Sequence, residues 1–313
     1  MSSIAPSPIT SPSAVASSLV PSASTASASV ESAKEDDEDV TIRFTDIQSL
    51  FQTINSTTGD ILLVTDVSPS SFAKIERERE KRGRAFRFRR YNSDSRTLII
   101  IILTKLHEQL HLGLYHQFHY QLFQTGMHQA WRSMGSATLR RQGHPAGDAG
   151  EGDSTGLPDP ERIGMDDWPT LVIEAGDGRD SESLNWLRDD MRWWFLASNH
   201  DVKIIMLAKF DHRRRHILLE RWEEQEWHPQ GAMTRNRAAI QQQRGLVPIL
   251  RQEITITRDA KTNPVSYNVT RGALVLGFKL LFLRDPGPGE GDFVISVREL
   301  QKYAERVWSY VRA

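Results

Sequence analysis

The sequence predicts an α/β fold with a mixed β-sheet, and three consecutive segments carry this prediction. "PTLVIEAG" (169–176) and "DVKIIMLAKF" (201–210) have the unbroken apolar runs of buried strands. Between them, "SESLNWLRDDMRWWFLAS" (181–198) has the spacing of an amphipathic helix. A helix that joins two buried strands is typical of a parallel pair. We therefore expect these two strands to be adjacent and parallel in the sheet.

The segments before this unit also alternate between strands and helices. Apolar or alternating runs predict strands over 60–67, 84–91 and 96–103. Helical spacing predicts helices over 44–54 and 69–80 and a long helix from Thr104. In the long helix, leucines recur every four residues from Leu106, so one of its faces is expected to pack on the sheet.

The remaining segments extend the sheet. "ILLERWE" (217–223) follows the basic tip "HRRRH" and is expected to return as a hairpin strand, which makes the sheet mixed. A loop rich in Gly, Pro and Asp is expected over about 135–167, and a polar stretch over about 228–244. Further strands are expected over 253–259, 273–285 and 292–297, before a closing helix over 298–311.

Composition sets the domain organisation. Residues 1–39 are mostly Ser, Ala and Pro and end in an acidic run, which predicts a disordered tail, and residues 40–313 are expected to form a single α/β domain. The absence of cysteine excludes disulfides and thiolate metal sites. The longest apolar run, Leu98 to Leu103, is too short to span a bilayer, so no membrane association is expected. Without a secretory signal pattern, an intracellular location, cytoplasmic or nuclear, is expected.

The stretch "LHEQLH" raises the first question of chemistry. His107, Glu108 and His111 match H-E-x-x-H, in which two histidines on one helix face bind zinc and the glutamate is a general base. The extended motif would need Gly and His where the chain has Leu114 and Gln117. We therefore interpret the histidines as part of a polar helix stripe that continues through Tyr115 and His119, and not as a zinc protease motif.

Glu174 raises the second question. It stands at the carboxyl end of a buried strand, where open α/β sheets place their sites. An unpaired carboxylate in a core costs several kcal/mol, on the order of 3 or more, so it is usually paired, protonated or metal-bound. The alternative is that Glu174 ends the strand at the surface and pairs with an arginine.

Five segments, "GDSTGLPDP", "WPTLVIEAG", "SESLNWLRDDMRWWF", "DVKIIMLAKFD" and "ILLERWE", carry a resemblance to known proteins. They resemble the PD-(D/E)XK restriction-endonuclease-like superfamily, and they are especially similar to a group of uncharacterised fungal proteins. The resemblance covers most of the chain from Val40 onward. It implies a restriction-endonuclease-like αβββαβ core at about residues 98–227, with N-terminal and C-terminal α+β additions.

The resemblance also implies metal-dependent phosphodiester hydrolysis. In this superfamily an Asp and a strand Glu hold Mg²⁺ (or Mn²⁺), often with a helix Glu, and these positions correspond to Asp153, Glu174 and Glu108. Asp148 and Asp159 are the alternatives for the first. The catalytic Lys two residues after the strand Glu is replaced by Gly176.

The missing lysine leaves two functions open. A basic residue from another element can replace it, and Lys203 on the next strand is preferred over Arg188 and Arg192 on the helix between. The protein would then be a metal-dependent nuclease. Without a replacement, it would be an inactive nuclease-like module that binds protein or nucleic acid.

Two basic stretches are candidates for contact with nucleic acid. One is the basic and aromatic run from Arg84 to Tyr91, and the other is the tip from His212 to His216. If Phe86 and Phe88 face the core, only Arg87 and Arg89 of the first stretch remain exposed, and we favour its interpretation as a half-buried edge strand. The second is most simply a solvated hairpin tip. The net charge of −1 gives no general electrostatic argument for nucleic acid, and the oligomeric state cannot be predicted.

Overall fold

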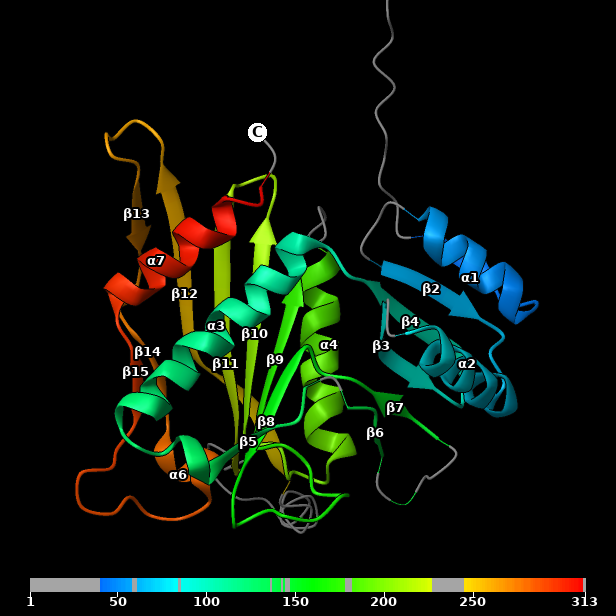
Figure 1. Cartoon of the computed structure of the whole chain (residues 1–313), viewed down its shortest axis with the longest axis horizontal. Coiled ribbons are helices and arrows are strands. Elements are labelled where there is room, and N and C mark those ends of the chain that lie inside the picture. Colours follow the sequence, from blue (N-terminus) through cyan, green and yellow to red (C-terminus); the bar gives the residue numbers. More distant parts are fainter. Residues whose placement is uncertain are drawn as a thin grey trace, which may run out of the picture. The chain divides into compact units, whose positions relative to one another are not determined.

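The computed structural model describes residues 40–57, 61–83, 86–135, 137–141, 143, 147–177, 182–226 and 245–311 (Figure 1). The expected tail over 1–39 and the expected polar stretch over 228–244 lie outside these residues. Asp37–Ala313 forms one unit. Two main β-sheets and the helices on their faces make up its described part.

The larger sheet has seven strands in the order β13-β12-β11-β10-β9-β8-β5. Its strands are β5 (Trp131–Ser133), β8 (Ser154–Pro158), β9 (Leu171–Gly176), β10 (Ile204–Asp211), β11 (His216–Glu226), β12 (Leu246–Asp259) and β13 (Ser266–Val269). β9 and β10 are parallel, and the other neighbours are antiparallel. The expected adjacent parallel pair is therefore confirmed, with helix α4 (Glu182–Ala197) between the two strands in sequence.

Helices cover both faces of this sheet, as alternation along β9 shows. Ile173 and Ala175 pack in one cluster with α3 (Lys105–Gln124) and α7 (Val297–Trp308). Val172 packs in a second cluster with α4 on the opposite face. Figure 1 shows α3 and α7 crossing the same face of the sheet. Because neighbours in a strand point to opposite faces, Glu174 lies on the α4 face with Val172.

The smaller sheet has six strands in the order β1-β2-β4-β3-β7-β6. These are β1 (Val40–Arg43), β2 (Ile61–Thr65), β3 (Phe86–Asn92), β4 (Thr97–Ile102), β6 (Leu139–Arg140) and β7 (Ala149–Gly150). The helices α1 (Ile47–Ser56) and α2 (Pro69–Arg82) cover one face of it, where Phe86, Phe88 and Tyr91 are buried. The pairing of β3 with β4 shifts register between Phe88 and Arg90, which marks a β-bulge at Arg89.

The C-terminal segment forms a two-stranded sheet and two helices. β14 (Leu274–Leu276) pairs with β15 (Phe293–Ile295), and α6 (Phe278–Phe282) lies between them in sequence. A short 3-10 helix, η1 (His128–Ala130), precedes β5. Ser296 and Glu299 form a capping box at the start of α7. Within the described part of the chain, every helix is too short or too polar to cross a membrane.

Two expectations about elements are wrong. The single strand expected over 273–285 is β14 followed by α6, whose Phe278, Leu281 and Phe282 are buried with helical spacing. The loop expected over 135–167 contains β6, β7 and the central strand β8. β8 has no apolar alternation because small residues are needed there: a Cβ on Gly156 would lie 2.5 Å from Trp131 Nε1 and 2.6 Å from the Tyr115 hydroxyl.

Candidate metal centre and the carboxylates around it

The first two turns of α3 present His107, Glu108 and His111. Thr104 fixes where this helix begins, because its side chain accepts a hydrogen bond of 3.0 Å from the backbone N–H of His107. The histidines are four residues apart and therefore share one face of the helix. Both are fully buried, whereas the Glu108 side chain is about 30% exposed.

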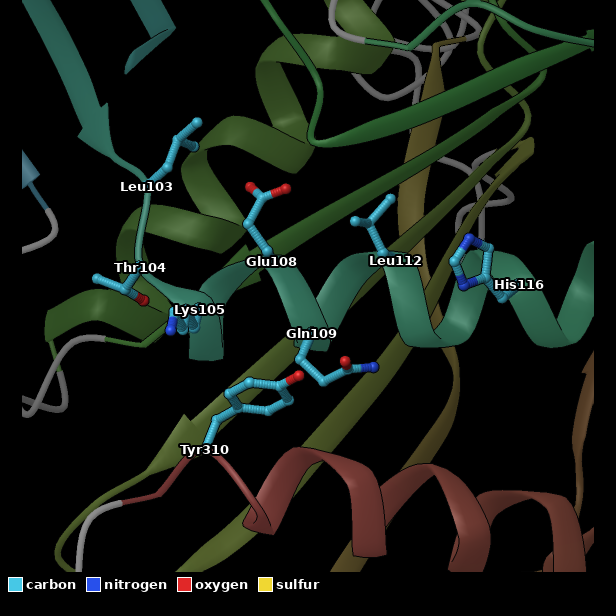
Figure 2. Close-up of a pocket in the computed structure, with 8 residues that line it drawn as sticks. All are labelled: Leu103, Thr104, Lys105, Glu108, Gln109, Leu112, His116 and Tyr310. Atoms are coloured by element: carbon cyan, nitrogen blue, oxygen red, sulfur yellow. The ribbon is translucent and has the colours of Figure 1, made fainter. Parts of the chain in front are cut away.

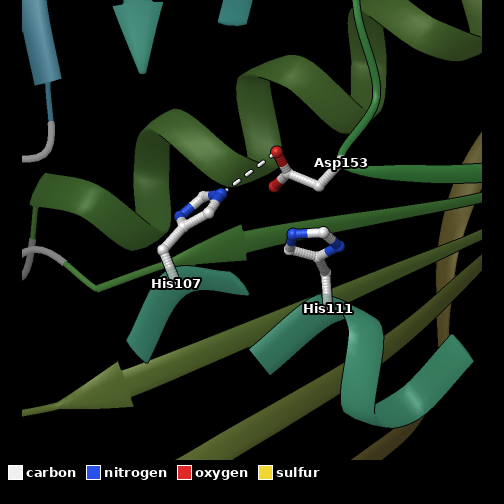
Figure 3. A group of neighbouring side chains, drawn as sticks. All are labelled: His107, His111 and Asp153. Atoms are coloured by element: carbon white, nitrogen blue, oxygen red, sulfur yellow. Dashed lines mark ion pairs between the residues drawn. The ribbon is translucent and has the colours of Figure 1, made fainter. Parts of the chain in front are cut away.

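Asp153 faces these histidines from the residue before β8. Its Oδ1 lies 3.1 Å from His107 Nε2, and its Oδ2 accepts a hydrogen bond of 2.8 Å from the backbone N–H of Ala175 in β9. The ligand atoms of His107, His111 and Asp153 lie within 4.8 Å of one another (Figure 3). These three buried residues can hold a metal ion, and they are the one such group among the residues that the structure describes.

The guanidinium of Arg87, on β3, also lies in this group. Its Nη1 is 3.0 Å from Asp153 Oδ1 and 3.4 Å from His111 Nε2, and it donates to the Asp153 carbonyl at 3.1 Å. Its Nη2 lies 3.1 Å from Glu108 Oε1. One guanidinium therefore pairs with both Glu108 and Asp153.

Electrostatics sets different ionisation states in this group. Burial opposes the ionisation of Asp153, but His107, His111 and Arg87 together hold the pKa of its carboxyl well below the usual range. Burial lowers the pKa of His111, although its contact with Glu108 acts in the other direction. The carboxylate is therefore charged and this imidazole neutral at pH 7, which are the forms that bind metals.

Glu174 is buried under α4, and only 2% of the residue is exposed. Its Oε1 accepts a hydrogen bond of 2.6 Å from Trp194 Nε1. Burial first, and then the negative charges of Asp153 and Asp190, raise the pKa of Glu174 well above its usual range, although Arg89 opposes the shift. The protonated form of this buried carboxyl group is therefore favoured, and the alternative that Glu174 ends the strand at the surface is excluded.

The three carboxylates predicted as metal ligands do not form one group. Arg87 connects Glu108 with Asp153, and Asp153 is hydrogen-bonded next to Glu174 at Ala175. Glu108, Asp153 and Glu174 nevertheless do not bring three ligand atoms within 4.8 Å, whereas the two histidines and Asp153 do. The reason is that Glu174 points to the α4 face while the histidines approach from α3.

Lys203 does not lie beside Glu174, contrary to expectation. In the register of β9 and β10, Ile204 pairs with Leu171, so Lys203 lies at the opposite end of β9 from Glu174. Its Nζ donates to the His200 carbonyl at 2.6 Å. Arg188 binds Glu220, and Arg192 pairs with Asp189 at 2.6 Å, so neither arginine is directed to Glu174.

Lys209 on β10 lies beside Gly176, the position at which the superfamily that the sequence resembles has its lysine. It is the Cα partner of Gly176 in the parallel pair, and only 4% of the residue is exposed. Partners in register point to the same face, so Lys209 and Glu174 share the α4 face. A Cβ on Gly176 would lie 3.0 Å from Leu187 Cδ1, so α4 leaves little room for a side chain at that position.

The other candidate aspartates have different surroundings. Asp148 accepts a hydrogen bond of 3.2 Å from the backbone N–H of Ser93 and lies 3.6 Å from Arg141. Asp159 lies 3.9 Å from Arg132 at the surface. Asp153 is therefore the aspartate of this segment that faces the candidate centre.

The basic and aromatic stretch does not form a free cationic surface in its described part. Phe86, Phe88 and Tyr91 lie in the core, and Arg89 is buried against Asp190. Only 4% of Arg89 is exposed, so the expectation that Arg89 is exposed is wrong. Arg84 lies outside the described residues.

The basic tip is a hairpin turn, as its solvated alternative predicted. It joins β10 and β11, and Arg213, Arg214 and Arg215 are exposed. His212 Nε2 lies 2.7 Å from Asp177, the residue after β9, so the tip is next to the carboxyl end of β9. Asp177 also accepts a hydrogen bond of 3.0 Å from the Thr104 hydroxyl.

An open pocket of about 430 Å³ borders the same end of α3. Figure 2 shows Glu108, Leu112 and His116 on successive turns of α3 and Tyr310 beside Gln109. Glu108 belongs both to this pocket and to the ion pair with Arg87, so it connects the buried centre with the surface.

The interpretation of the sequence missed His107, His111 and Arg87 as residues of the centre, and it missed Lys209 on the α4 face. The H-E-x-x-H pattern was the available signal for the histidines, but their third partner is more than forty residues further along the chain. No family model matches the chain, and no curated protein matches it.

Proposed function

We propose that the protein is a metal-dependent phosphodiesterase that acts on nucleic acid. The observation that carries the proposal is the position of Lys209 beside Gly176, on the same face as Glu174. An ammonium group there can position the attacking water and offset charge on the phosphoryl group, as the lysine does in the PD-(D/E)XK superfamily that the sequence resembles.

The order of the elements also supports the proposal. α3, β5, β8, β9, α4 and β10 follow one another as αβββαβ, interrupted by η1, β6 and β7. The four strands are neighbours in the order β5-β8-β9-β10. Asp153 precedes β8 and Glu174 lies on β9, as the resemblance implies for the two acidic positions. The restriction-endonuclease-like core is part of this proposal.

In the proposed mechanism, Asp153 and Glu174 are the residues that would hold Mg²⁺ or Mn²⁺. The metal supplies a Lewis acid and an activated water when it is bound. Glu174 must release its proton to serve as a ligand, because its pKa is raised in the metal-free protein. The exposed arginines 213–215 near the carboxyl end of β9 would attract the phosphate backbone of the substrate. A substrate of this class fits an intracellular location, cytoplasmic or nuclear.

The test is hydrolysis of a panel of DNA and RNA substrates while Mg²⁺ or Mn²⁺ is titrated. We expect Lys209→Met to lower turnover by about 10²-fold or more, the loss typical of one electrostatic stabiliser. Lys203→Met is the matched control, because Lys203 directly precedes β10 whereas Lys209 lies near its carboxyl end. The turnover of Lys203→Met should be unchanged. Equal activity of the two variants would refute the role of Lys209.

A second function is favoured by the burial of the acidic residues. Asp153 is 5% exposed and Glu174 2%, and Arg87 already neutralises Asp153. In an inactive nuclease-like binding module, Asp153 would stay paired with Arg87 and the two acidic residues would bind no metal. It predicts no turnover in the parent protein with either metal, together with nucleic-acid binding that weakens when the arginines of the tip are replaced by glutamine.

A further inference from the structure

We infer that His107, His111 and Asp153 bind a divalent transition metal of the zinc class, and that the guanidinium of Arg87 occupies the cation's place until the metal arrives. This site goes beyond the proposed phosphodiesterase, because it uses a different face of the sheet and ligands that Mg²⁺ does not prefer. It shares only Asp153 with the proposed catalytic residues.

The donor atoms select the class of metal. Two imidazole nitrogens and one carboxylate oxygen suit Zn²⁺ and the other borderline divalent metals, whereas Mg²⁺ prefers oxygen ligands. Ligand atoms about 2.0–2.1 Å from a tetrahedral zinc are about 3.4 Å apart. The distance of 3.1 Å between His107 Nε2 and Asp153 Oδ1 is close to that separation. All three ligand atoms lie within 4.8 Å of one another, so binding requires only that His111 and its partners approach to the tetrahedral separation.

The surrounding residues orient the ligands as metal sites require. Ser154 Oγ lies 2.8 Å from His111 Nδ1, so the other nitrogen, Nε2, is directed toward the group. The backbone N–H of Ala175 holds the second oxygen of Asp153 at 2.8 Å, which leaves Oδ1 for the metal. Figure 3 shows both imidazole rings on α3 facing the Asp153 carboxylate.

Arg87 is the residue that must move. Its Nη1 touches both Asp153 Oδ1 and His111 Nε2, so a metal bound to these atoms would lie beside a like charge. Glu108 gives the guanidinium an alternative partner, because Nη2 already contacts it at 3.1 Å and Glu108 borders the open pocket. Metal binding is therefore expected to transfer Arg87 from Asp153 to Glu108 alone.

Three protein ligands leave a fourth tetrahedral position, which is the arrangement of catalytic zinc sites. Glu108 is next to that position, because its Oε1 is 3.2 Å from His111 Nε2. The pocket that Glu108 lines gives water or a small anionic ligand access to the fourth position.

The test is calorimetric titration of the chelator-treated full-length chain with Zn²⁺, with Mg²⁺ titrated in parallel. Co²⁺ in place of Zn²⁺ provides a visible absorption spectrum that reports tetrahedral nitrogen and oxygen coordination. We expect one Zn²⁺ per chain and no competition from Mg²⁺ at equal concentration. Arg87→Met should tighten Zn²⁺ binding about tenfold or more, because the competing charge is gone and Asp153 is no longer neutralised. His111→Gln should weaken binding about 100-fold.

Matched controls come from the same two elements. Arg90→Met removes an arginine of β3 that contacts Asp190 instead, and His119→Gln removes a histidine of α3 that contacts Ser133. Both should bind Zn²⁺ within about twofold of the parent protein. Circular dichroism checks that each variant is folded; if His111→Gln is not, Arg87→Met and the Co²⁺ spectrum of the parent decide the result.

Several results would overturn the inference. Equal affinities of Arg87→Met and Arg90→Met would show that Arg87 does not compete with the metal. Unchanged binding in folded His111→Gln would place the metal elsewhere, and competition by Mg²⁺ at equal concentration would exclude the zinc class. If neither the parent protein nor Arg87→Met binds Zn²⁺, the group is an ion-pair network and not a metal site. These readouts measure binding, so they remain distinct from a failure of the proposed hydrolysis.

Discussion

Replacement of Glu174 by glutamine tests whether this carboxyl group is protonated in the folded, metal-free protein. Below its ordinary pKa of 4.5, Glu174 carries a proton in both the folded and the unfolded chain. Above that pH the unfolded chain releases the proton, while the folded protein keeps it because its pKa is raised. The free energy of unfolding must then fall as the pH rises, until the pH passes the folded-state pKa.

The magnitude follows from one proton. One proton bound to the folded state alone changes the free energy of unfolding by about 1.4 kcal/mol for each pH unit between the ordinary pKa and the raised folded-state pKa. Glu174→Gln keeps the side-chain volume, and its carbonyl can still accept the hydrogen bond from Trp194. The variant should therefore gain stability relative to the parent as the pH rises.

The assay is urea unfolding with chelator present at pH 5, 6 and 7. The difference between variant and parent isolates Glu174 from the histidines that titrate in the same range. Glu78→Gln, the same chemical change at a half-buried helix position that pairs with Lys81, should show a constant difference over this range. A constant difference for Glu174→Gln would refute the raised pKa and with it the proton release on metal binding.

Two further predictions concern stability. Arg79 and Glu151 form a buried ion pair with hydrogen bonds of 2.6 and 2.7 Å. Glu151→Gln and Arg79→Met should therefore each lower the free energy of unfolding by about 3–5 kcal/mol, measured by urea unfolding at pH 7. A loss below about 1 kcal/mol would contradict the reasoning. Gly156→Ala should destabilise by about 1–3 kcal/mol, because the added methyl would overlap Trp131 and Tyr115, whereas Gly291→Ala, with no atom near its Cβ, should have little effect in the same assay.

The parts of the fold that the sequence predicted are those with a local signal. β9, α4 and β10 were found because long apolar runs and helical spacing are visible within each segment. β8 was missed because Ser154, Thr155 and Gly156 are buried by close contact with neighbours, and such contacts leave no periodic pattern.

The candidate centre was predicted only in part for a similar reason. Asp153 and Glu174 followed from the resemblance, but Lys209 depends on the register between two strands, which a single sequence does not display. The burial of Arg89 depends on its contact with Asp190 of α4, and the metal group depends on bringing Asp153 to α3. Each of these is a property of tertiary structure rather than of one segment.

The buried pair of Arg79 and Glu151 has a consequence for how the chain can be divided. Glu151 also accepts hydrogen bonds from the backbone N–H of Phe88 and from Thr138, and it lies two residues before Asp153. A truncated chain that began at the predicted core, near Leu98, would lose Arg79, Arg87 and Arg89. It would leave Glu151, Asp153 and Asp190 as buried anions without their arginine partners. The smaller sheet is therefore expected to be inherited, deleted or transplanted only together with the larger sheet.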